Sequence, residues 1–115
     1  MDEFLKVMKA LSDPNRVMML KALQERELCV CEIQALIGLA QPTVSKHLKI
    51  LEKAGLVSSH KKGLWVNYRL ADGARSPYAA VILGNLRHWL GNDPAVKALI
   101  EGAVTVSREE IKGRP

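Results

Sequence analysis

The stretch QPTVSKHLKILEKAG, residues 41–55, constrains the fold of this chain more than any other. Pro42 suits the first turn of a helix, and Gly55 is a typical stop signal. The apolar stripe consists of Val44, Leu48 and Leu51. Such a stripe must cover an apolar partner, so one face of the predicted helix is buried and the opposite face stays in solvent.

The segments on either side of this helix predict a helix-turn-helix followed by a β-hairpin. Residues 30–37 have the pattern of a short helix, which Gly38 ends. Downstream, residues 56–60 and 64–70 alternate like strands around the turn Lys-Lys-Gly at 61–63. Two helices joined by a short turn and followed at once by a hairpin are typical of winged-helix proteins.

Further helices are predicted at both ends of the chain. They cover residues 2–11, a segment that Ser12 caps and that runs to about Gln24, a segment from Ser76-Pro77 to about Leu90, and a short last helix that starts at NDP, residues 92–94. The expected fold is mainly α with a small β-hairpin (α+β), in the order α-α-α-α-β-β-α(-α), and dimeric. Residues 1–106 should form one DNA-binding and dimerisation domain, with a flexible tail at 107–115.

Composition favours an anionic partner. The chain has 115 residues with 17 Lys and Arg against 12 Asp and Glu, a formal net charge of +5, so nucleic acid is the first candidate. No apolar run approaches the ~20 residues of a membrane span. The acidic, amphipathic N-terminus is unlike a secretory signal. A cytoplasmic protein with reduced thiols is expected.

The solvent face of the helix at 41–55 and the hairpin turn carry side chains that suit DNA. Amides and hydroxyls can reach base edges, and lysines neutralise phosphates. The candidates are Gln41, Thr43, Ser45, Lys46, His47 and Lys49 on the helix, and His60, Lys61 and Lys62 on the hairpin. The alternative interpretation is an ordinary solvated helix face.

The helix predicted over residues 77–90 has apolar side chains on more than one stripe, which requires a second partner. We expect that partner to be a second copy of the chain, with an interface built on residues 4–11 and 77–90. The candidate residues are Phe4, Val7, Met8, Leu11, Tyr78, Val81, Ile82, Leu86 and Trp89.

Both cysteines of the chain, Cys29 and Cys31, lie in the stretch ELCVCEI. Thiolates are ligands for soft metals and metalloids. On an ideal helix these two side chains would point ~200° apart, whereas alternate residues of an extended segment share a face. Metalloid binding should therefore favour an extended or unwound start of the helix at 30–37. The alternatives are a pair of small buried residues, or a redox pair, because thiols near a helix N-terminus have lowered pKa values.

Four stretches together resemble the arsenical-resistance repressors of the ArsR family. They are ALSDPNRVMMLKAL, ELCVCEI, QPTVSKHLKILEKAGLV and KKGLWVNYRL, and they follow the family's order and spacing from Phe4 to Leu70. The resemblance implies a homodimeric winged-helix repressor. It would bind double-stranded operator DNA with an inverted repeat and leave it when trivalent arsenic or antimony binds Cys29 and Cys31.

The sequence departs from the family pattern at two positions. Gln34 stands where the family often has a third cysteine, and Ala40 stands where a hydroxyl-bearing helix cap is favoured. A regulator without arsenic sensing, redox-responsive or with another inducer, is therefore the second hypothesis. A thiol enzyme is the third and weakest, because no nucleophile, base and orienting group stand at readable spacing. We expect no enzyme activity and no organic cofactor. Arg16 is interpreted as a capping and packing residue, and His88 as a lone histidine.

Overall fold

Six helices and a three-stranded antiparallel sheet make up the part of the chain that the computed structural model describes, residues 1–106. The elements are α1 (Asp2–Ala10), α2 (Pro14–Leu23), β1 (Leu28–Cys29), α3 (Val30–Ile37), α4 (Gln41–Lys53), β2 (Val57–Lys62), β3 (Trp65–Leu70), α5 (Pro77–Leu86) and α6 (Pro94–Thr105). Over these residues no helix is both long and apolar enough to span a membrane. The tail predicted at 107–115 lies outside the described residues.

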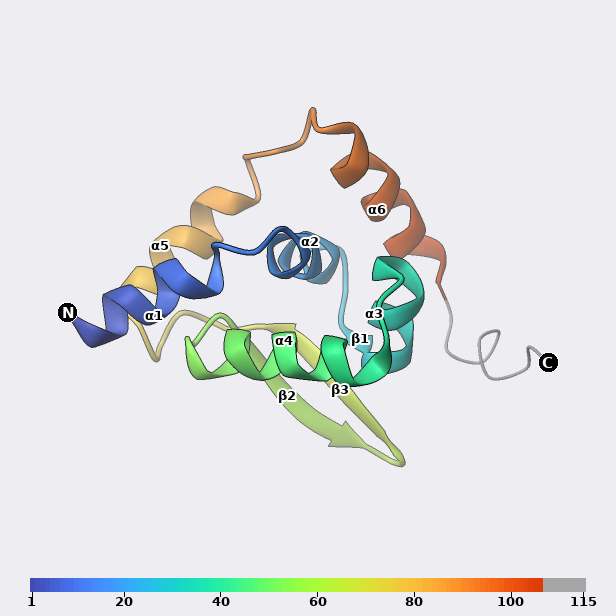
Figure 1. Cartoon of the computed structure of the whole chain (residues 1–115), viewed down its shortest axis with the longest axis horizontal. Coiled ribbons are helices and arrows are strands. Elements are labelled where there is room, and N and C mark those ends of the chain that lie inside the picture. The colour runs from blue at the N-terminus through green and yellow to red at the C-terminus, as the bar shows by residue number, and fades with distance from the viewer. Residues whose placement is uncertain (107–115) are drawn as a thin grey trace.

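The predicted helix-turn-helix is confirmed as α3 and α4. Gly38 ends α3 with a left-handed φ of 81°, a conformation that costs glycine little. The inner stripe of α4 is fully buried against α1, α2 and α3, and α4 ends before Gly55, which has φ 80°. Ala40 precedes α4 without a side-chain cap, as its sequence predicts. In Figure 1, α4 lies below α1 and α2, and the hairpin projects beyond it.

The hairpin is confirmed, with two corrections. Lys61 and Lys62 belong to strand β2 rather than to the turn, which consists of Gly63 and Leu64. Gly63 has φ 65°, the left-handed conformation that tight hairpin turns require. The second correction is a third strand, β1, which pairs with β3 and gives the order β1-β3-β2. The hairpin is therefore anchored to the segment that carries the cysteines.

Two helix boundaries differ from the predictions. Asp13, not Ser12, caps α2: its carboxylate accepts the backbone N–H groups of Asn15 and Arg16 at 2.8 and 3.3 Å. The helix predicted to reach Leu90 ends at Leu86. Here the buried Lys21 of α2 donates from Nζ to the backbone carbonyls of Leu86 and Trp89, both at 2.9 Å. The carbonyl of Leu86 also accepts the backbone N–H of Trp89 at 3.0 Å, so Lys21 adds a long-range contact to a turn that closes the end of α5.

Candidate thiol site and nucleic-acid interface

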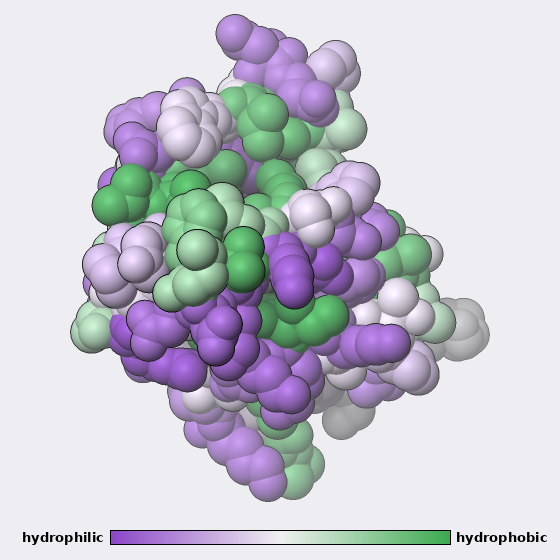
Figure 2. All heavy atoms as spheres, turned by 60° about the vertical axis from the view of Figure 1, so that its left-hand side comes forward, coloured by the Kyte–Doolittle hydropathy of each residue, from purple (hydrophilic) through white to green (hydrophobic). Residues whose placement is uncertain are grey.

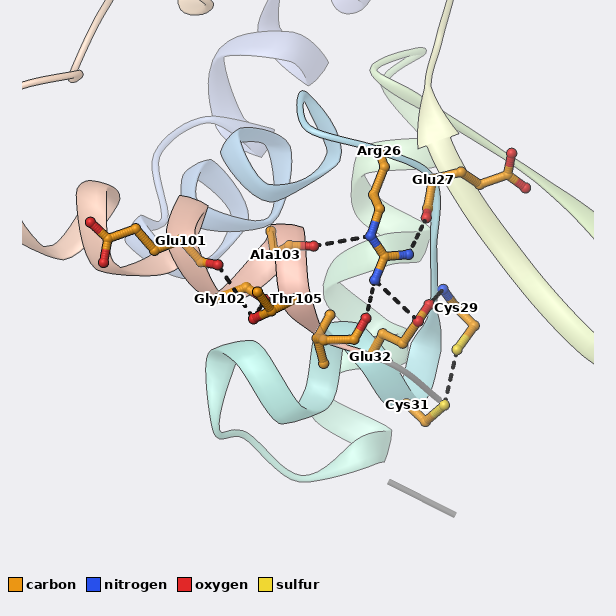
Figure 3. Close-up of polar contacts among 10 residues, drawn as sticks. Arg26, Glu27, Cys29, Cys31, Glu32, Glu101, Gly102, Ala103 and Thr105 are labelled. Carbon is orange, nitrogen blue, oxygen red and sulfur yellow. Dashed lines mark hydrogen bonds and ion pairs between the residues drawn. The ribbon is translucent and has the colours of Figure 1, made fainter. Parts of the chain in front are cut away.

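The two thiols meet at the junction of β1 and α3. Cys29 is the residue before the first turn of α3 and is extended, with φ −84° and ψ 167°. Cys31 lies within that first turn. Their Sγ atoms are 2.9 Å apart, and Figure 3 shows the side chains pointing toward each other. Cys29 is extended, as predicted for a shared face, but α3 already begins at Val30, so no turn of helix has to open to bring the sulfurs together.

The two cysteines differ in environment. Cys29 is 1% exposed, whereas Cys31 is half-buried. Burial raises the pKa of the Cys29 thiol from 9.0 to about 12, and the hydrogen bond with Cys31 and the nearby Glu32 carboxylate act in the same direction. The lowered pKa expected for a thiol at a helix N-terminus is therefore wrong for Cys29, because burial outweighs the helix dipole.

Glu32 and Arg26 connect the thiol segment to the C-terminal end of α6. The backbone N–H of Cys29 donates to Oε1 of Glu32 at 2.9 Å, and Nη2 of Arg26 lies 3.4 Å from Oε2 of the same carboxylate. Figure 3 shows the Arg26 guanidinium between Glu32 and α6, where it donates to the backbone carbonyls of Ala103 and Val106. A buried carboxylate, rather than solvent, therefore accepts the backbone N–H of Cys29.

A cavity of about 340 Å³ adjoins the thiols. It is lined by Cys29, Val30, Cys31, Gln34, Gln41, Leu64, Trp65 and Val66. Gln34 therefore shares a cavity with both thiols, although it cannot supply a soft ligand. Within residues 1–106, no group of three or more His, Cys, Asp or Glu side chains is placed to hold a metal ion. The cavity also brings the thiols beside the first residue of α4 and the hairpin turn.

Most of the predicted DNA-binding side chains lie on accessible surface. Gln41, Thr43, Lys46 and Lys49 of α4 are exposed, as are Lys61 and Lys62 of β2. Ser45 and His47 are half-buried on α4. His60 differs from the rest: it is half-buried, and its Nε2 lies 2.6 Å from the Glu27 carboxylate. His60 is therefore paired with a carboxylate of its own chain, whereas Lys61 and Lys62, which follow it on β2, are exposed.

Sequence reasoning missed the role of Arg16 behind α4. Its guanidinium contacts the imidazole of His47 and also the end of α1. The predicted capping role fits the backbone N–H of Arg16, which donates to Asp13, but it does not account for the contact between the guanidinium and His47. The sequence signal available was an arginine in the first turn of a helix, and the separation of 31 positions between Arg16 and His47 hides the pairing.

An apolar surface lies over α1 and α5. Phe4 and Tyr78 are 41% and 39% exposed and stack edge to face with ring centroids 5.5 Å apart. Val81 and Trp89 are also exposed, and Met8, Leu11 and Ile82 are half-buried. Figure 2 turns this side of the molecule forward and shows hydrophobic residues gathered among hydrophilic ones. Val7 and Leu86 are a correction to the predicted interface, because both are buried within the chain itself.

Comparison with known proteins identifies relatives of this chain. Residues 13–59 match the model of the bacterial regulatory proteins of the arsR family. The arsenical resistance operon repressor of Escherichia coli is 38% identical over 97 residues, which are 84% of this chain and 80% of the relative. The chain belongs to the ArsR family. The arsenic resistance regulator ArsR1 of Pseudomonas putida is likewise 38% identical, over 76% of this chain and 71% of that protein.

Other similar proteins include a regulator of cadmium resistance and a solved structure with the same fold. The cadmium resistance regulator CadC of Listeria innocua is 49% identical over 52% of this chain and 51% of that protein. A homodimeric winged helix-turn-helix DNA-binding domain from Mycobacterium bovis aligns with a TM-score of 0.65 and 28% identity, covering 76% of this chain and 77% of that one. This ArsR-family protein is therefore a winged-helix transcriptional repressor, and family membership confirms that it is a DNA-binding regulator rather than an enzyme.

Proposed function

We propose that this ArsR-family repressor senses trivalent arsenic or antimony through Cys29 and Cys31 and then releases its operator. The observation that carries the proposal is the pair of free thiols 2.9 Å apart. Two soft donors at that distance suit one soft metalloid ion better than a hard cation. The arsenical resistance repressor among the relatives supports the same inducer class.

The donor set limits the site to two sulfurs. Gln34 lines the cavity at the place where a third cysteine would add a ligand, and its amide is a weak donor to a soft ion. A third position on the inducer would be filled by water or hydroxide. We therefore expect a two-sulfur site, held by Cys29 and Cys31, whose occupant contacts the start of α4 and the hairpin turn across the cavity.

A redox response is the second candidate, favoured by the contact between the two sulfur atoms. Oxidation by peroxide requires a thiolate. The raised pKa of Cys29 disfavours its thiolate, which oxidation and metalloid binding both use, so the choice between the two candidates rests on the response to inducers rather than on this pKa.

A panel of inducers tests the proposal. Arsenite, antimonite, cadmium and zinc would be titrated into the protein while the sulfur-to-ligand absorbance and the release of fluorescent operator DNA are followed together. We expect arsenite and antimonite to saturate at one equivalent per chain and to release the DNA. Release by cadmium or zinc alone, or by peroxide alone, would contradict the proposed inducer.

The DNA interface should divide into backbone and base contacts. Replacing Lys46, Lys49 or Lys62 by Ala should weaken binding to all DNA and reduce the slope of log K against log salt by about 0.9 for each phosphate that is no longer neutralised. Ser45→Ala should instead reduce the ratio of the affinity for operator DNA to the affinity for random DNA. Lys97→Ala on the exposed face of α6 is the control. If all variants changed both affinities alike, this division would be wrong.

The DNA-bound form should be a homodimer in the cytoplasm that reads an inverted repeat. The exposed apolar surface over α1 and α5 supports self-association, and the similar Mycobacterium bovis domain is described as homodimeric. Two copies would place their α4 helices roughly 34 Å apart, one turn of DNA. Sedimentation at micromolar concentration checks this, because a monomer would contradict it.

A further inference from the structure

Arg16 is held in place before it meets α4. Its Nε donates to the backbone carbonyl of Ala10 at 2.7 Å, and its Nη2 donates to that of Lys9 at 3.1 Å. The remaining terminal nitrogen, Nη1, lies 3.0 Å from Nδ1 of His47. The end of α1 thus fixes the guanidinium plane and points one N–H at the imidazole. A lysine could match the charge of this arrangement but not its fork of donors.

This contact determines which nitrogen of His47 carries the proton. A guanidinium has donors and no acceptor, so Nδ1 must offer its lone pair for the bond to exist. The proton of the imidazole is then on Nε2. Nδ1 of His47 therefore accepts from Arg16, and the Nε2–H group remains available to donate to another partner.

The surroundings of His47 show what that N–H can bind. Arg16 and His47 line a hollow of about 460 Å³ beside the first half of α4. The other lining residues are Pro42, Thr43, Lys46 and Ile50. Arg16 and Lys46 make the hollow cationic, and Thr43 adds a hydroxyl. Charge together with hydrogen-bond donors is the chemistry that recognises a phosphate of nucleic acid.

We propose that this hollow seats a phosphate of the operator backbone, and that Arg16 is the positioning residue that presents His47 to it as a donor through Nε2. The proposal rests on the proposed function in one respect, that α4 approaches DNA. It assigns to a residue of α2, outside the helix-turn-helix, a part in holding the DNA.

The first test needs no DNA. Nitrogen-15 correlation spectra of the imidazoles at pH 8 report which ring nitrogen carries the proton, and His60 and His88 give internal references. We expect the Nε2–H form for His47 in the wild type. Arg16→Lys, which keeps the charge and loses the fork, should give a mixture of both forms. A proton on Nδ1 of His47 in the wild type would overturn the proposal.

The second test separates the phosphate from other roles. His47→Asn keeps an acceptor near the place of Nδ1 but has no group at the place of Nε2, so affinity for operator and random DNA should fall by the same factor, roughly tenfold. His47→Gln, whose amide reaches further, should recover part of the loss. Lys46→Ala is measured beside both variants.

The outcomes of this second test are distinct. Weakened binding to operator but not to random DNA would mean that His47 reads a base, which overturns the phosphate assignment. Unchanged binding by His47→Asn while Lys46→Ala weakens both DNAs would reject His47 as a phosphate donor, and with it the role of Arg16, and would leave the proposed function standing. Unchanged binding by the His47 and Lys46 variants while Lys49→Ala weakens both DNAs would reject the hollow as a phosphate site, whereas unchanged binding by all three variants would reject the proposed contact between α4 and DNA as well.

Discussion

Replacing either thiol by a hydroxyl should abolish arsenite-induced release while leaving operator binding intact. Cys29→Ser and Cys31→Ser each remove one of two soft donors, and a single thiol cannot hold the ion between two sulfurs. The loss of arsenite affinity should exceed the roughly 10- to 100-fold that removal of an outer-shell partner costs a metal site. Arsenite-dependent release of labelled operator measures it.

Operator binding should survive because neither cysteine lies on the exposed face of α4. Serine is also a favoured residue before a helix, so Cys29→Ser keeps or improves the start of α3. Gln34→Ser is the matched control, since it alters the same cavity without touching a thiol. Normal release by either cysteine variant would show that the inducer binds elsewhere.

Lys21→Met should lower the free energy of unfolding by about 2 kcal/mol, because methionine fills the space but removes the two hydrogen bonds that Lys21 donates to the carbonyls of Leu86 and Trp89. Lys21 is 2% exposed, so water cannot take over these bonds. Part of the loss is offset because a buried charge is removed. Urea unfolding measures the change, with the exposed Lys97→Met as control. A stability equal to that of the wild type would mean that the Lys21 hydrogen bonds contribute nothing net.

The same variant has a pH signature. Burial lowers the pKa of Lys21 from its ordinary 10.5, although Glu25 opposes the shift. Between the lowered value and 10.5, the unfolded chain holds more protons than the folded chain, so this group adds stability as pH rises and loses it as pH falls. The difference in unfolding free energy between wild type and Lys21→Met should therefore grow toward pH 10.5. A difference that shrinks over this range would contradict the assignment.

The helix-turn-helix could be predicted because its signals are local. The apolar stripe of α4, Pro42 in its first turn and Gly38 after α3 each act within a few residues, and the structure places all three as expected. The hairpin followed from strand alternation in the same way. Local patterns of this kind also gave the exposed lysines of α4 and β2.

The features that escaped prediction depend on residues far apart in the chain. The end of α5 is contacted by Lys21, 65 residues before Leu86. Strand β1 exists because Leu28 and Cys29 pair with Tyr68 and Asn67 of β3. That pairing buries Cys29 and raises the pKa of its thiol, which the helix position alone predicted to fall. Residue type and spacing identified the two thiols, but only the fold brings them beside Gln41 and the hairpin turn.

If the thiol pair and the DNA-binding surface are energetically coupled, operator DNA must change the affinity of the protein for arsenite. The arsenite affinity of the wild-type protein would be determined with and without saturating operator DNA. Because coupling is reciprocal, operator should weaken arsenite binding by a factor that corresponds to ~1–3 kcal/mol, roughly 5- to 150-fold. Equal arsenite affinities in the free and DNA-bound protein would contradict the account.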